Sequence, residues 1–176
     1  MYQYKMLVSV GAIAVVTAGC MSKVPSNKVA SESIESGAKT SVESLLFDQK
    51  TYFLENRAFT TSVKDLKTGL LTETQSYQYK LAPQPNKYKG VAIKATSKKS
   101  NLRSFTGVVF VVKSGKEQVT LSQVCETVNP SKVAPTAPTN PKKASDKIEC
   151  PSGSRSSFEV ATKQGQQLSV LFTPNP

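Results

Sequence analysis

The first regular pattern in the chain is helical and covers residues 31–56. Apolar residues recur there at steps that place them on one stripe of a helix: Ile34, Ala38, Val42, Leu45, Leu46 and Phe53. Ser31 is suited to cap the N-terminus, and Glu32 follows in the first turn, where the helix dipole favours acids. Asn56 tolerates the left-handed conformation that ends many helices. The stripe is sparse before Val42, so we expect the first turns to be exposed and the later ones buried.

The chain then changes to the alternation of strands. We predict strands over residues 76–82, 88–96, 105–112 and 119–125. The third of these is apolar at nearly every position, which is typical of a central strand buried on both faces. Short connections favour an antiparallel meander within residues 76–125. The predicted fold class is α+β, with one N-terminal amphipathic helix packed on an antiparallel sheet of four or more strands in a roll.

The rest of the chain is poorer in pattern. Residues 126–148 are low in apolar side chains and rich in Pro, Thr, Ser and Lys, which predicts an exposed loop within the segment 125–150. Two short apolar runs flank Gly165 and predict a final hairpin, within C-terminal strands over residues 157–173. The folded domain is therefore expected to span residues 31–173.

The N-terminus is a different kind of segment. Residues 6–18 form an apolar run of 13 residues, which is too short to span a bilayer but suits a signal peptide. The run ends in Thr17-Ala18-Gly19-Cys20, which resembles the lipobox of bacterial lipoproteins. That resemblance implies a signal peptide over residues 1–19, a lipid on Cys20 and a flexible tether over residues 20–30. The alternatives are an ordinary cleaved signal peptide and an uncleaved anchor.

The cysteine count agrees with export. If Cys20 carries a lipid, Cys125 and Cys150 remain as a pair, and we expect them to form a disulfide in an oxidising compartment. The alternative, a structural zinc site, is disfavoured because the chain has no histidine. These features predict a lipid-anchored membrane protein on the extracytoplasmic side of a bacterium, periplasmic or at the cell surface.

Positive charge is concentrated in one part of the chain. The formal net charge is +11, and residues 74–116 hold nine bases and no acid. Such a region suits contact with an anionic polymer, DNA or polysaccharide, or with an anionic membrane surface. The alternative is a lysine-protected sheet face and edge. The candidate contact residues are Lys87, Lys89, Lys94, Lys98, Lys99 and Arg103.

The search for catalytic chemistry finds little. Without histidine, Ser-His and Cys-His arrangements are excluded. Ser36 and Lys39 match the S-x-x-K pattern of penicillin-binding enzymes, but no S-D-N or K-T-G partner motif accompanies them. We predict no catalytic residue, no metal and no cofactor, and so a protein that is not an enzyme.

At the end of the predicted helix, Tyr52-Phe53-Leu54-Glu55-Asn56 is followed by Phe59-Thr60 and by Val63-Lys64-Asp65-Leu66. This junction is similar to that of type IV pilins and pseudopilins. The strand Phe105-Thr106-Gly107-Val108-Val109 and the bracket from Cys125 to Cys150 resemble the type IV pilin-like G/H proteins, a family frequent in cyanobacteria. The resemblance covers residues 36–155 and implies a pilin head domain.

One departure from pilins shapes the functional prediction. The Gly-Phe cleavage site, the glutamate and the long apolar helix of a prepilin are missing from the printed sequence, and a lipobox stands in their place. The predicted function is therefore that of a non-enzymatic envelope lipoprotein. It would present a pilin-like domain to envelope or pilus proteins. The alternative is a surface adhesin or receptor that binds anionic polymers through the basic region 80–103.

Overall fold

The computed structural model describes residues 26–66, 69, 72–84, 86 and 89–157 of the chain. One α-helix, a 3-10 turn and five strands follow one another along these residues. They are α1 (Ser26–Asn56), η1 (Val63–Leu66), β1 (Tyr77–Pro83), β2 (Gly90–Ser97), β3 (Phe105–Ser114), β4 (Glu117–Thr127) and β5 (Ser154–Ser156).

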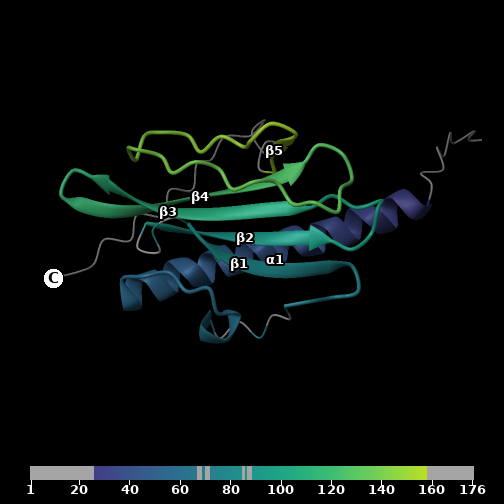
Figure 1. The fold of residues 1–176 in the computed structure, drawn as a ribbon, viewed down its shortest axis with the longest axis horizontal. Coiled ribbons are helices and arrows are strands. Elements are labelled where there is room, and N and C mark those ends of the chain that lie inside the picture. The colour runs from purple at the N-terminus through teal and green to yellow at the C-terminus, as the bar shows by residue number, and fades with distance from the viewer. Residues whose placement is uncertain (1–25, 67–68, 70–71, 85, 87–88, 158–176) are drawn as a thin grey trace, which may run out of the picture.

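The strands form one antiparallel sheet in the order β1-β2-β3-β4-β5, with α1 along one face (Figure 1). This arrangement confirms the predicted α+β class. β5 is a short strand beyond the four that the alternation pattern predicts. The predicted C-terminal strands from residue 158 onward, including the hairpin at Gly165, lie outside the described residues.

α1 ends at Asn56, as predicted, but its start and the residue that closes it differ from the sequence prediction. The helix begins at Ser26, so Ser31 is an internal helical residue and not its N-cap; its hydroxyl accepts a hydrogen bond from Asn101 Nδ2 instead. At the other end the left-handed residue is Arg57, with φ 55°, and not Asn56. Asn56 stays helical, and its side-chain amide donates to the carbonyl of Tyr52, one turn earlier.

The main core lies between α1 and the sheet. From Ala38 onward the apolar stripe of the helix is buried against alternate residues of β1 to β4. Gly107 in β3 lets the helix come close, since a Cβ atom there would lie 2.5 Å from Val42 Cγ1 and 2.9 Å from Leu46 Cδ1. The register of α1 on the sheet therefore depends on a missing side chain at one strand position.

The opposite sheet face is covered by the segment 128–153, a packing that the prediction of an exposed loop did not include, although most residues of the segment are exposed. Ala137 and Ile148 pack against the cluster of Ala92, Val108 and Phe110. The buried hydroxyl of Thr106 also donates to the carbonyl of Pro135 at 2.7 Å. A segment with few apolar residues covers this face because it uses two apolar contacts and its own carbonyls as acceptors.

The turn after α1 is held by a buried polar group. The Gln49 side chain donates to the Thr60 carbonyl at 2.7 Å and accepts from the Thr60 amide at 3.2 Å. Phe59 folds back under the end of the helix and stacks on Phe53, with ring centroids 4.8 Å apart. Both backbone groups of Thr60 are thus satisfied away from water, which fixes the direction in which the chain leaves the helix.

Candidate functional site

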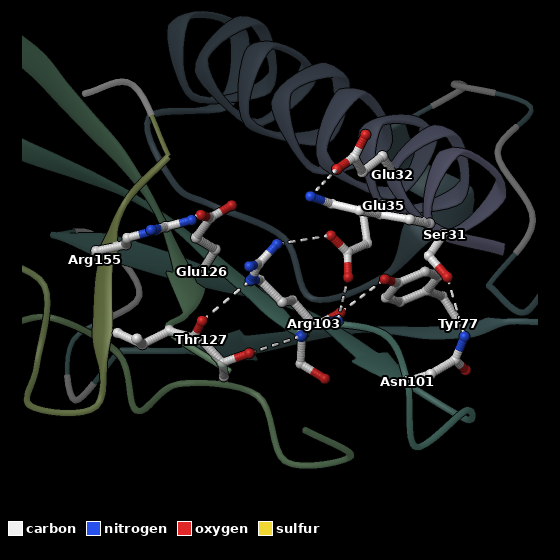
Figure 2. Close-up of polar contacts among 12 residues, drawn as sticks. Ser31, Glu32, Glu35, Tyr77, Asn101, Arg103, Glu126, Thr127 and Arg155 are labelled. Atoms are coloured by element: carbon white, nitrogen blue, oxygen red, sulfur yellow. Dashed lines mark hydrogen bonds and ion pairs between the residues drawn. The ribbon is translucent and has the colours of Figure 1, made fainter. Parts of the chain in front are cut away.

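The first half of α1 is fastened to the sheet through Arg103, which lies two residues before β3. The Arg103 amide donates to Glu35 Oε1 at 2.7 Å, and its guanidinium Nη1 donates to Glu35 Oε2 at 3.0 Å (Figure 2). Its Nε donates to the Val128 carbonyl, and its own carbonyl accepts from the Tyr77 hydroxyl at 2.7 Å. One residue therefore joins α1, β1 and the chain beyond β4, and we call this group the Arg103 hub.

The Arg103 hub is partly shielded from solvent. The side chain of Glu35 is 12% exposed, and Tyr77 is buried in the main core. Desolvation raises the pKa of Tyr77 well above its ordinary value, and the negative charge of Glu35 raises it further. Tyr77 is therefore a neutral hydrogen-bond donor across the physiological pH range, which is the role that the Arg103 carbonyl requires.

Arg103 is expected to act in stability, so its loss should be visible in unfolding. Arg103→Gln removes the charge partner of a largely buried carboxylate and should lower the free energy of unfolding by about 2 kcal/mol. Lys98→Gln is the matched control, because Lys98 pairs with Glu73 at the surface and its loss should leave unfolding unchanged. Urea denaturation of the two variants measures both effects. Equal stabilities would contradict the role given to the hub.

The predicted basic contact residues do not form one cluster. Lys89 precedes β2 and Lys98 follows it, so about 30 Å of strand separates them. Two of these bases form ion pairs with acids of the same chain. Arg103 pairs with Glu35, and Lys98 Nζ lies 2.7 Å from Glu73 Oε1. Lys94 points to the loop-covered face, Lys99 is exposed at the β2–β3 connection, and Lys87 lies outside the described residues.

The remaining chemical candidates are dispersed as well. Ser36 is exposed on α1, while Lys39 Nζ donates to the Ser157 carbonyl and pairs with Glu43. No group of three or more potential metal ligands occurs in the described part of the chain. An open groove of about 440 Å³ runs between the first half of α1 and residues 74–79, and its walls carry hydroxyl, amide and apolar groups.

The two later cysteines pair as predicted. Cys125 in β4 and Cys150 form a disulfide, with Cα atoms 5.6 Å apart. The bond ties the end of the segment 128–153 to the strand beneath it. Cys20, the predicted lipid site, lies outside the described residues. Within the described ranges, no helix has both the length and the apolar composition needed to cross a membrane.

A long helix that enters an antiparallel sheet through a fixed turn, with a disulfide-closed segment after it, is consistent with a pilin-like domain. The comparison with known families agrees. Residues 35–151 match the family model of type IV pilin-like G and H proteins, about two thirds of the chain, and the chain belongs to this family. No curated protein and no solved structure matches it. Membership indicates a pilus- or pseudopilus-related component of the cell envelope.

Proposed function

We propose that this protein is a non-enzymatic envelope lipoprotein that presents a pilin-like domain to pilus or envelope proteins. The observation that carries the proposal is the position of Cys20 relative to α1. Cys20 lies six residues before Ser26, and a segment of that length spans at most about 20 Å. A lipid on Cys20 would therefore hold the N-terminal end of α1 close to the membrane surface.

This anchoring gives the domain an orientation. The β2–β3 connection contacts the first half of α1 through Asn101 and Arg103, so it would face the membrane. The β3–β4 turn lies at the opposite end of the domain (Figure 1) and would face outward. That distal turn carries Lys113, Lys116 and Glu117, all exposed, and it is the end that a partner in the envelope would meet first.

Metabolic labelling with palmitate in the native host tests the anchor. The unmodified protein should take up label and fractionate with membranes, and Cys20→Ser should do neither. The double variant Cys125→Ser, Cys150→Ser is the control, since it removes cysteines but should keep the label. Incorporation of label into Cys20→Ser would overturn the lipid anchor.

Photo-crosslinking in intact cells tests the orientation and the partner. A photoreactive residue at Lys116 should capture a pilus or envelope protein, and the same residue at Lys99 should give lipid adducts or none. Capture of protein from position 99 alone would reverse the proposed orientation. Capture from neither position would remove the proposed role in protein contacts.

A further inference from the structure

Three segments that are distant in sequence meet at the end of the domain where α1 begins (Figure 1). They are residues 26–35 of α1, residues 98–104 between β2 and β3, and residues 128–133 after β4. On one side, Asn101 Nδ2 donates to the hydroxyl of Ser31 at 3.0 Å. On the other side, the amide of Ser131 donates to the carbonyl of Leu102 at 2.9 Å. We call the solvent-facing part of these three segments the proximal surface.

The proximal surface holds most of the large apolar side chains that are exposed in the described ranges. Four of the six belong to it: Val29, Ile34, Val128 and Val133. Val133 is 74% exposed, and the hydroxyl of Ser131 holds its backbone by accepting from its amide at 3.0 Å and donating to its carbonyl at 3.1 Å. Exposed apolar residues gathered at one end of a domain indicate an interaction surface.

The proximal surface also has an excess of positive charge. Its three segments hold five bases and two acids. The two acids each pair with a base of the same surface, and Lys98 pairs with Glu73. Lys99 and Lys132 are exposed, and neither forms an ion pair within the part of the chain that the structure describes. Two positive charges are therefore available to an anionic partner.

This combination of side chains fits a membrane better than a soluble polyanion. Valine side chains can enter the headgroup region of a bilayer while lysine ammonium groups bind the phosphates of anionic lipids. A soluble polyanion would use the charges but leave the valines in water, and two charges neutralise few of its phosphates. The position of Cys20 agrees, because the six residues from it to Ser26 span at most about 20 Å.

We propose that the proximal surface binds directly to a membrane that contains anionic lipids, with Val29, Val128 and Val133 in the headgroup region and Lys99 and Lys132 on lipid phosphates. The inference rests on the lipid anchor proposed above, which brings this surface within reach of the bilayer. Contacts that are weak alone are sufficient once the anchor makes the binding intramolecular. Two points of attachment then fix the tilt of the domain, so that the β3–β4 turn projects away from the membrane.

Photo-crosslinking on vesicles tests the lipid contact. The full chain, purified from its host with a photoreactive residue at Val133 or at Lys116, is reconstituted into vesicles of phosphatidylcholine with or without phosphatidylglycerol. Position 133 should give lipid adducts with phosphatidylglycerol present and about tenfold fewer without it. Position 116, at the distal turn, should give none in either. Equal yields at position 133 in the two kinds of vesicle, or adducts at position 116 alone, would overturn the proposal.

Charge variants separate binding by the lysines from mere proximity to the bilayer. Lys99→Gln with Lys132→Gln should reduce the adduct yield at position 133 about tenfold in vesicles with phosphatidylglycerol. Lys113→Gln with Lys116→Gln is the matched control, since it removes the same charge from the distal turn and should leave the yield unchanged. A short DNA added to these vesicles is the competing polyanion. Crosslinks from position 133 to the DNA in place of lipid would reassign the surface and contradict the proposal.

Flotation of the vesicles distinguishes a failure of this inference from a failure of the anchor. A chain that floats with the vesicles but gives no lipid adduct at position 133 keeps the anchor and loses the contact of the proximal surface. A chain that stays in the soluble fraction loses both. Val133 is an exposed residue outside the core, so the photoreactive residue should leave folding intact, and circular dichroism checks this.

Discussion

Replacement of Gly107 by valine is expected to lower the free energy of unfolding by about 3 kcal/mol. The helix and the sheet touch at this position without room for a side chain: a Cβ atom would meet Val42 and Leu46 at 2.5 and 2.9 Å. Valine adds two further methyl groups in a core where neither neighbour is exposed. The helix must then move away from β3 and lose packing along its buried half.

Urea denaturation followed by circular dichroism measures this effect, and Gly37→Ala provides the control. Gly37 lies in an exposed part of α1, and a methyl group on its Cα would have no neighbour within 4 Å. Alanine there should raise the free energy of unfolding by about 1 kcal/mol, because glycine is a poor helix former. A Gly107→Val variant as stable as the unmodified protein would contradict the close packing of α1 on β3.

Loss of the disulfide is expected to have an effect of similar size. The bond closes a loop with a sequence separation of 25 residues, and its removal by Cys125→Ser with Cys150→Ser should cost about 3.5 kcal/mol through the entropy of the unfolded chain. The loop also covers Val108 and Phe110, so this sheet face should lose its cover more often in the variant. The unfolding free energy measured in urea reports the first effect.

Limited trypsin digestion reports the second effect. Lys142, Lys143 and Lys147 are exposed on the covering segment and should be cleaved faster in the double variant, before the rest of the domain. Cys20→Ser is the control and should leave both stability and digestion unchanged. Uniform digestion over the whole domain would indicate that the segment does not open independently of the sheet.

The sequence predicts the sheet better than it predicts the segment 128–153, which covers one face of the sheet. The apolar pattern in residues 76–125 is sufficient to predict four strands, with alternation in the first two and a continuous apolar run in β3. The run over β3 is apolar on both faces, and a single helix covers one face only. A second cover was therefore required. Composition gave little sign of it, since the segment binds the Thr106 hydroxyl through the Pro135 carbonyl and contacts the apolar cluster through Ala137 and Ile148.

The basic region shows why charge along the chain is a weak guide to a site. Arg103 and Glu35 are 68 residues apart in sequence, and Lys98 and Glu73 are 25 apart, so neither pairing can be read from local charge. The sequence shows Glu35 only as an acidic residue on the predicted helix. In the structure its side chain is largely buried. Only the packing of α1 beside the β2–β3 connection brings it to Arg103 (Figure 2).

The Arg103 hub has a mechanical consequence. α1 runs along the direction of the strands (Figure 1), so a pull between its N-terminal end and the distal β3–β4 turn would load the helix and the sheet in shear. The Arg103 hub would bear this load first, because it binds the N-terminal half of α1 to β1 and to the residues just before β3. Bonds loaded together in shear must break together. Under tension this domain would hold as a unit and give way abruptly, with a lifetime set by its rate of unfolding.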